Sequence, residues 1–330
     1  MVTSRKRLAA AMLASCSIAV AATACSTDSE MKRSDGSVCE NTYTIGFSHP
    51  VSEAAFVSGL KKSIDNAAAQ EGCVEVLYDR TTANNLETQR STIESWVTQS
   101  VDAIVVLPVD EAALEGLRTQ AQANGIKWLT YGSKLENADG SAGFDNVASG
   151  QLVANWIGES VVPNVPAGRV TAMVTAVSAL PVFKGRWELP IAALQRVGIP
   201  IVSQQDCSDQ ACGLEITEAT LREHPDLRVV VGLNDDAALG AQRAFINAGV
   251  DLSTVYIAGQ DGSPEGLDAV KNGGAYKLSA AIQVKDLAQS IVQNSINAVQ
   301  GSGPTDSETP VVAATLDDPE TLNSLIAQFQ

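Results

Sequence analysis

The sequence predicts an α/β protein built from two units, each a parallel sheet covered by helices on both faces. Short runs rich in β-branched residues recur along the 330-residue chain, and segments with helical periodicity separate them. Most of these runs are apolar throughout, which is typical of strands that are buried on both faces. Hydrophobic residues make up 45% of the chain, enough to form two cores.

Nine strands are predicted in chain order, with helical segments between them. The strands are expected at residues 44–47, 74–78, 103–107, 127–131, 170–175, 199–203, 229–233, 255–258 and 278–282. In the first helical segment, Phe56, Leu60 and Ile64 recur every fourth residue and would share one buried face. Asp110 and Asn234 stand where side chains commonly cap a helix N-terminus.

The two units are expected to part near Asp145 and Asn146. The stretch at 301–310, GSGPTDSETP, is rich in turn-forming residues and is interpreted as a linker, because an apolar segment at 311–316 follows it. No internal repeat, low-complexity block or charge run interrupts the alternation of strands and helices.

The first 24 residues have the composition of a secretory signal peptide. Arg5, Lys6 and Arg7 precede an Ala-rich apolar stretch, and small residues at 21–24 lead to Cys25. A cysteine in this place resembles a bacterial lipobox, so we expect lipid on Cys25, with plain secretion as the alternative. Residues 25–40 would then be a flexible tether. This predicts a lipoprotein outside the cytoplasm, on the outer face of the cell membrane.

Export makes the cysteine count informative. Once Cys16 and Cys25 are set aside, an even number of cysteines remains, which predicts two disulfides in an oxidising compartment: Cys39, Cys73, Cys207 and Cys212. The first two each precede a predicted strand, so they would meet if those strands are parallel neighbours. The last two are five residues apart and would pair locally. A metal site on this last pair is the alternative, but other ligands are not nearby.

Charge and motif content argue against several function classes. Lys and Arg number 22 against 38 Asp and Glu, a net charge of −16, whereas a nucleic-acid binder needs a basic face. His49 and His224 are the only histidines, which leaves little for histidine-based catalysis or metal binding. Phosphate-loop, dinucleotide and nucleophile-elbow motifs are absent from the sequence. We therefore expect a binding protein, not an enzyme, with no metal and no organic cofactor.

Ligands of parallel sheets bind where strands end and loops enter helices. In this chain those loops lie at 48–55, 108–110, 132–136, 175–184, 234–235 and 261–262, with Gln283 at another strand end. They supply hydroxyls, amides, carboxylates, one lysine and the neighbouring Phe56. Such side chains suit a neutral, polyhydroxylated small molecule.

Five segments then give a recognisable pattern. They read IGFSHP…AAFVSGLKKSIDNAA at 45–69, TIESWVTQSVDAIVVLPVD at 92–110, GFDNVASGQLVANWI at 143–157, VVVGLNDDAALGAQRAFINAG at 229–249 and VYIAGQDGSPEGLDAVKNGG at 255–274. The last two are the most specific, with Asn-Asp-x-x-Ala-x-Gly followed by Gly-x-Asp-Gly-x-Pro. From about 43 to 312 the chain resembles the ribose/galactose-type periplasmic binding proteins, which feed ABC importers.

The resemblance implies a type I periplasmic binding protein fold: two Rossmann-like three-layer (α/β/α) lobes joined by a three-crossing hinge. It places the N-terminal lobe at 41–145 plus 284–303 and the C-terminal lobe at 146–283 plus 310–317, with a tail at 318–330. The crossings would lie near 145–146, near 283–284 and within 301–310.

The resemblance also implies a function. A monomer would capture a small sugar-like ligand by hinge closure and deliver it to an ABC permease with a cytoplasmic ATPase. The alternative is a receptor that signals through a membrane sensor, including reception of a quorum-type signal.

Only some of the family's binding residues are present at the corresponding positions of this chain. Its stacking aromatic falls on Phe56, while its usual Asn-Pro reads Glu53-Ala54 and its second aromatic falls on Ala55. A ligand-gripping Asp-Arg pair falls on Gly132 and Ser133 and is therefore absent. The basic residue after the fifth strand falls on Lys184 or Arg186. The expected ligand-binding residues are Ser48, Glu53, Phe56, Ser133, Lys184, Asn234, Asp261 and Gln283.

Overall fold

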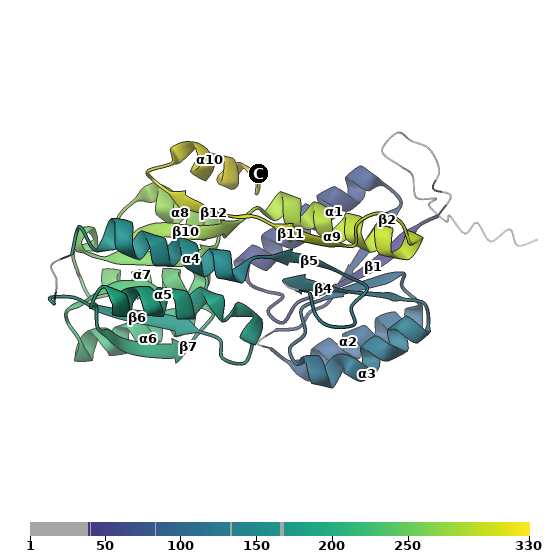
Figure 1. Ribbon diagram of the computed structural model, residues 1–330, viewed down its shortest axis with the longest axis horizontal. Coiled ribbons are helices and arrows are strands. Elements are labelled where there is room, and N and C mark those ends of the chain that lie inside the picture. Colours follow the sequence, from purple (N-terminus) through teal and green to yellow (C-terminus); the bar gives the residue numbers. More distant parts are fainter. Residues whose placement is uncertain (1–38, 40, 83, 133, 166–167) are drawn as a thin grey trace, which may run out of the picture. The chain divides into compact units, whose positions relative to one another are not determined.

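The computed structural model describes residues 39, 41–82, 84–132, 134–165 and 168–330. The expected signal peptide, Cys25 and Ser133 lie outside the described residues. Two six-stranded sheets form the framework, each with helices on both faces (Figure 1). This confirms the predicted fold class.

The first sheet is parallel throughout. Its strand order is β11-β5-β4-β3-β1-β2, with bounds β1 (Tyr43–Ser48), β2 (Val74–Tyr78), β3 (Ala103–Val106), β4 (Lys127–Gly132), β5 (Gly140–Phe144) and β11 (Asp306–Thr309). Apolar side chains of α1 (Ala55–Glu71) and α9 (Val284–Gln300) bury one face. Those of α2 (Leu86–Gln99) and α3 (Glu111–Ala123) bury the other.

The second sheet has one antiparallel edge strand, β12. Its order is β12-β10-β9-β8-β6-β7, with bounds β6 (Thr171–Ala176), β7 (Ile201–Asp206), β8 (Leu227–Val231), β9 (Tyr256–Asp261), β10 (Tyr276–Ile282) and β12 (Val311–Thr315). Helices α4 (Asn146–Trp156) and α5 (Gly185–Arg196) pack on one face. The other face carries α6 (Gln210–Glu223), α7 (Asp235–Asn247), α8 (Pro264–Asn272) and α10 (Pro319–Ala327).

Three short helices complete the element order. A π-helical turn, η1 (Ile157–Val161), continues α4, and two 3₁₀ turns, η2 (Pro181–Phe183) and η3 (Leu252–Thr254), precede α5 and β9. The chain passes between the two sheets three times: after β5, after β10 and between β11 and β12.

The structure contains three strands beyond the nine predicted. One of them, β12, lies in the apolar segment at 311–316 that the sequence singled out. Another, β11, lies inside 301–310, so the interpretation of that whole stretch as a linker is wrong. The third, β5, reads Gly-Ser-Ala-Gly-Phe and carries no β-branched residue. A Cβ atom at Gly140 would collide with the Thr305 carbonyl, so the small residue is needed for the close approach of the neighbouring segment.

Both expected disulfides are present. Cys39 is bonded to Cys73, with their Cα atoms 5.5 Å apart, and the parallel pairing of β1 with β2 brings the two strand starts together. Cys207 is bonded to Cys212 across the start of α6, with Cα atoms 5.8 Å apart.

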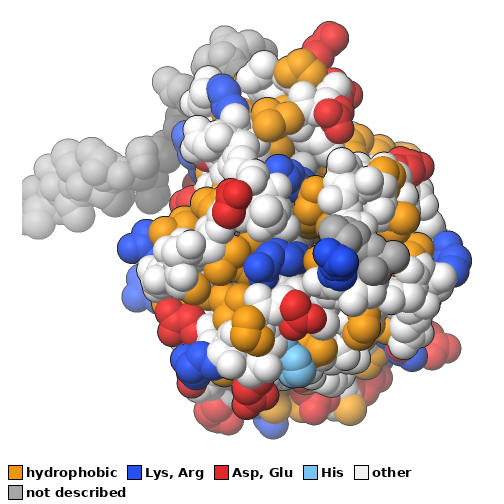
Figure 2. Space-filling model, turned by 90° about the vertical axis from the view of Figure 1, so that its left-hand side faces the viewer, with side chains coloured by type: hydrophobic (Ala, Val, Ile, Leu, Met, Phe, Trp, Pro, Cys, Tyr) orange, Lys and Arg blue, Asp and Glu red, His pale blue; other side chains and the backbone are white. Residues whose placement is uncertain are grey.

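Two surface properties bear on function. Within the described parts of the chain, no helix combines the length and apolarity needed to cross a membrane. On the face drawn in Figure 2, acidic and basic side chains are interspersed. The described residues of that face therefore form no broad basic surface of the kind that nucleic-acid binding requires.

Candidate functional site

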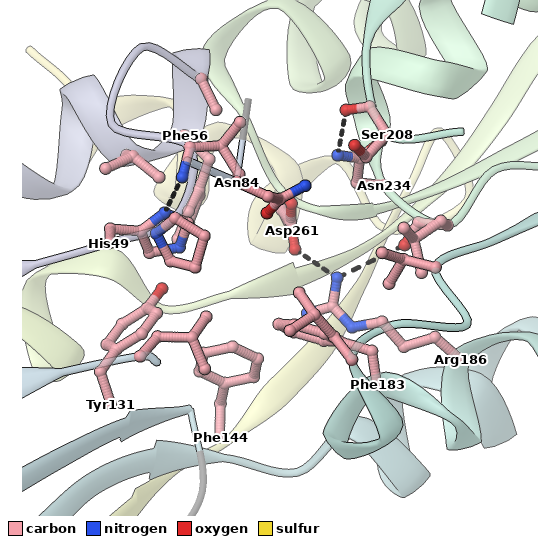
Figure 3. A pocket seen from close by; sticks show the side chains of 18 residues that line it. His49, Phe56, Asn84, Tyr131, Phe144, Phe183, Arg186, Ser208, Asn234 and Asp261 are labelled. Carbon is pink, nitrogen blue, oxygen red and sulfur yellow. Dashed lines mark hydrogen bonds and ion pairs between the residues drawn. The ribbon is translucent and has the colours of Figure 1, made fainter. Parts of the chain in front are cut away.

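A small pocket lies where loops at the carboxyl ends of both sheets meet (Figure 3). Its volume is about 80 Å³. At about 10–15 Å³ for each water molecule, this is room for roughly five to eight waters, which suits a compact metabolite. The lining residues are His49, Pro50, Val51, Ala54, Phe56, Val57, Asn84, Leu107, Tyr131, Phe144, Val177, Leu180, Phe183, Arg186, Ser208, Leu233, Asn234 and Asp261.

Arg186 is the cation of this pocket, and its side chain is only 2% exposed. Its Nε donates to Asn146 Oδ1 at 2.7 Å, and its Nη1 donates to Asp261 Oδ1 at 2.5 Å. The guanidinium carbon lies 5.3 Å from the ring centre of Phe144 and 5.1 Å from that of Phe183. Such contacts favour a cation that has lost its water. Its Nη2 is buried and has no hydrogen-bond partner among the described residues.

Close packing of two helices places Arg186. A Cβ atom at Gly150 on α4 would collide with the carbonyl of Gly185, and one at Gly185 would lie 2.9 Å from the Asn146 carbonyl oxygen. The two glycines therefore let α4 and α5 approach at their N-terminal ends. This approach brings Asn146 beside the guanidinium group that it helps to orient.

Asp261, the last residue of β9, is the acidic partner. Its backbone has φ +103°, a conformation that a side chain with a Cβ rarely adopts and that costs roughly 1–3 kcal/mol. Burial raises the pKa of its carboxyl group, and the charge and hydrogen bond of Arg186 oppose that rise. Figure 3 shows the carboxylate pointing at the guanidinium group, with a dashed line marking their contact. A strained acid held against a buried cation is typical of a functional site.

The wall contributed by the first sheet is aromatic and uncharged. Tyr131 makes edge contacts with both His49 and Phe144, at ring-centre distances of 5.4 and 5.6 Å. Nδ1 of His49 accepts a hydrogen bond from the Val51 amide at 3.1 Å. Burial, followed by the charge of Lys61, lowers the pKa of His49 to about 3, so the ring is neutral at physiological pH.

A second buried carboxylate, Asp79, fixes the loop that carries His49 and Val51. It accepts hydrogen bonds from the hydroxyls of Ser48, Ser52 and Thr81 at 2.6, 2.7 and 2.8 Å. It also accepts one from the His49 amide at 3.3 Å. The carboxylate thus holds this loop at the pocket edge, and Asp79 is not among the lining residues.

Three of the expected binding residues line the pocket: Phe56, Asn234 and Asp261. Phe56 is also part of the first core, which fits its position on the buried face of α1. The amide of Asn234 caps α7 through Ala237 and donates to the Ser208 carbonyl at 2.9 Å, so it positions two loops at the pocket.

The other expected residues that the structure describes lie away from the pocket lining. Ser48 is buried against Asp79 and Gln89. Glu53 lies in a separate groove beside α1. Lys184 is exposed and pairs with Glu188 at 3.1 Å. Gln283 is partly buried at the start of α9, outside the pocket lining.

The structure settles one alternative and adds residues that the sequence reasoning missed. Arg186, not Lys184, reaches the pocket. Tyr131 and Phe144 were missed, although Tyr131 is the last residue of a predicted strand, where a side chain near the ligand is expected. Phe183 lies in the candidate loop at 175–184 but was not among the expected binding residues. Among the described residues, no cluster of three or more potential ligands could hold a metal ion.

Comparison with known proteins gives a consistent assignment. A family model described as "Periplasmic binding protein domain" matches residues 45–303. The ribose import binding protein RbsB of Bacillus subtilis (strain 168) is 27% identical over 264 residues, which cover 79% of this chain and 82% of that protein. A xylitol-binding protein of Mycolicibacterium smegmatis is 28% identical over 254 residues, 71% of this chain and 68% of that protein.

A solved structure confirms the fold. An ABC transporter solute binding protein from Bacillus halodurans C-125, with bound myo-inositol, is similar with a TM-score of 0.75 and 23% identity. The match covers 88% of this chain and 99% of that chain.

Proposed function

Because the chain belongs to the periplasmic binding protein domain family, a family of binding proteins and not enzymes, we propose that it captures a small polar ligand for an ABC importer. The family implies an extracytoplasmic location. The ligand class is a sugar, a polyol or a related metabolite, in line with the ribose, xylitol and myo-inositol named for its relatives.

One observation carries this proposal: an ion pair between the buried Arg186 and the partly buried Asp261 faces a pocket that also receives side chains from the first sheet. Arg186 Nη2 is a donor without a partner among the described residues, and burying such a group is costly unless a ligand satisfies it. A ligand oxygen at that position would complete the site.

Hinge closure is the proposed mechanism. The pocket draws Tyr131 and Phe144 from one sheet and Arg186 and Asp261 from the other. A ligand that touches both sets gains its full binding energy only when they are together, so it shifts the population toward a closed form. A permease could then recognise that closed form.

The test is a thermal-shift screen of sugars and polyols, followed by calorimetric titration of those that bind. We expect binding that is weakened at least 10-fold in Arg186→Met and unchanged in Lys184→Met, which removes an exposed cation two residues away. Binding that survives Arg186→Met unchanged would place the ligand elsewhere. For a compound that binds, loss of its uptake in cells lacking this protein distinguishes transport from sensing.

A lipid anchor on Cys25 is part of the proposal. The small residues before Cys25 and the polar stretch behind it support this expectation. Intact mass and membrane fractionation of wild type and Cys25→Ala test it. We expect the variant to leave the membrane fraction, and equal retention of both proteins would refute the anchor.

A further inference from the structure

The pocket has one charged wall and one neutral wall. The second sheet and its helices supply both charged lining residues, Asp261 from β9 and Arg186 from α5. The described lining residues from the first sheet's loops and helices include no ionised group, since His49 is neutral near pH 7. A ligand bound between the walls therefore meets different chemistry on its two edges.

From this asymmetry we propose that the ligand is a neutral deoxysugar. One edge, a pair of adjacent oxygens, binds Arg186 and Asp261, and an edge lacking a hydroxyl packs on Val51, Leu107 and Phe144. The inference rests on the proposed function and narrows its ligand class.

The charged wall selects a pair of adjacent oxygens. Arg186 Nη1 and Asp261 Oδ1 are engaged with each other. Arg186 Nη2 remains as a donor, and Asp261 Oδ2 makes no hydrogen bond to the described residues. A vicinal diol fits both, because one oxygen can accept from the guanidinium group while the neighbouring hydroxyl donates to the carboxylate.

The same wall selects a neutral ligand. The ion pair is formally neutral, and the guanidinium group is enclosed between two aromatic rings. A ligand with a net charge would bring that charge into the pocket without an opposite partner, which is unfavourable in a desolvated site.

The opposite wall includes the polar side chains of His49, Asn84 and Tyr131, but its part next to Gly132 is apolar. Gly132 ends β4 beside the pocket, where a side chain at that position would contact Leu107 at 3.8 Å and Phe144 at 3.9 Å. Leu107 and Phe144 are 4% and 5% exposed, so this part of the wall is dry and apolar. A ligand hydroxyl packed on Leu107 and Phe144 would lose water and gain no hydrogen bond from these two side chains, whereas a methyl or methylene group would pack well.

The experiment compares sugars in matched pairs that differ by one hydroxyl. The pairs are D-galactose with D-fucose, D-glucose with 6-deoxy-D-glucose, L-mannose with L-rhamnose, and D-ribose with 2-deoxy-D-ribose. Calorimetric titration of the mature protein should show at least one pair in which the deoxy member binds about 10- to 100-fold more tightly, the range in which apolar sites discriminate added polar or missing apolar groups.

The outcomes separate this inference from the proposed function. If a hydroxylated member binds as tightly as its deoxy partner or more tightly in every pair that binds, the deoxysugar inference is overturned while capture of a polar ligand stands. If no deoxy compound binds, the inference is likewise overturned, and the wider screen of sugars and polyols decides the proposed function by itself.

Two variants test the two walls separately. Val51→Thr adds a hydroxyl to the neutral wall at nearly constant volume, so the preference for the deoxy member should shrink about 3- to 10-fold. Val162→Thr, at a residue 39% exposed outside the pocket lining, is the matched control and should leave the preference unchanged.

Asp261→Asn should weaken both members of a pair alike, because the diol edge is common to them. A preference that changes with Asp261→Asn but not with Val51→Thr would contradict the assignment of the edges.

Discussion

Asp79 and Asp261 are both carboxylates at the carboxyl ends of parallel strands, one in each half of the molecule, yet their surroundings differ: Asp79 is buried, whereas the Asp261 side chain is 18% exposed. Asp79 follows β2 and accepts hydrogen bonds from three hydroxyls and a backbone amide. Asp261 ends β9 and is bonded through one oxygen to Arg186. The first carboxylate is saturated by its own chain, whereas the second keeps an oxygen for another molecule. A strand-end acid therefore becomes a binding group only where the fold leaves part of it unsatisfied.

The largest expected effect comes from removing the cation that distinguishes Asp261. Arg186→Met leaves a largely buried carboxylate without its partner; breaking a fully buried ion pair in this way costs about 3–5 kcal/mol, and the partial exposure of Asp261 places the expected loss near the lower end. Urea unfolding of the ligand-free protein measures the loss. Lys184→Met is the control, since its pair with Glu188 is exposed and worth about 0–1 kcal/mol. Equal stability of the two variants would mean that the buried pair contributes no more than a surface pair.

The saturated carboxylate gives the next effect. Asp79→Ala leaves the hydroxyls of Ser48, Ser52 and Thr81 without their acceptor, and we expect a loss of about 2–3 kcal/mol in the free energy of unfolding. Asp65→Ala is the control, because that carboxylate accepts one exposed hydrogen bond, from Tyr78. If Asp79→Ala unfolds at the same urea concentration as Asp65→Ala, the network does not stabilise the loop.

The fold was largely predictable because its signal is local. Strands buried on both faces must be apolar, so most of the nine could be located from their apolar runs. The edge strands β2 and β7 are partly exposed and were located from their β-branched residues. The strands that composition did not locate, β5 and β11, read Gly-Ser-Ala-Gly-Phe and Asp-Ser-Glu-Thr. The pairing of β5 depends on the close approach of the neighbouring backbone at Gly140, and β11 is an edge strand. Neither property can be predicted from the hydrophobicity of the residues.

The site was less predictable because it depends on which way a side chain points. Lys184 and Arg186 are two residues apart at the start of α5, and such residues lie on nearly opposite sides of a helix. Only the packing of α4 against α5 decides which of them reaches the pocket. Phe144 was missed for a related reason, since it ends the strand that composition did not reveal.

A smaller effect should follow from keeping the shape of Asp261 and removing its charge. Asp261→Asn replaces a charge-assisted hydrogen bond to the ligand, worth roughly 1.5–3 kcal/mol, with a neutral one worth roughly 0.5–1.5 kcal/mol, so affinity should fall roughly 5- to 13-fold. Calorimetric titration with a compound found in the screen measures this. Asp268→Asn, on the exposed face of α8, controls for loss of one negative charge. Unchanged affinity would show that the ligand does not use the carboxylate.

The last prediction concerns a third acid, the buried Asp235, which accepts several hydrogen bonds as Asp79 does and has a raised pKa as Asp261 does. It accepts from Tyr276, Ser279 and the Ser263 amide at 2.7, 2.7 and 2.6 Å, but it has no ion-pair partner among the described residues. Burial, followed by the charge of Asp261, raises the pKa of Asp235 from 3.8 to about 7. Its hydrogen bonds only partly offset that rise.

The sign of the resulting pH dependence follows from proton binding. Between pH 4 and 7 the native state holds a proton on Asp235 that the unfolded state has released, so this group's contribution to stability falls as the pH rises. The slope is at most about 1.4 kcal/mol per pH unit. His49 acts in the opposite direction between pH 3 and 6.5, because its pKa is lowered on folding. The pH dependence of wild-type stability therefore contains the contributions of both Asp235 and His49.

Asp235→Asn isolates the effect of Asp235. The variant retains His49, so the stability of wild type minus that of the variant should decrease steadily from pH 4.5 to 7.5. Urea unfolding at several pH values in this range gives the difference, and Asp236→Asn, the neighbouring residue on α7, should give a flatter one. A difference that does not change with pH would mean that Asp235 titrates alike in the native and unfolded states. The hydrogen bonds to Asp235 would then fully cancel the rise in pKa that burial causes. Asp235 would in that case resemble Asp79, whose carboxylate is saturated with hydrogen bonds.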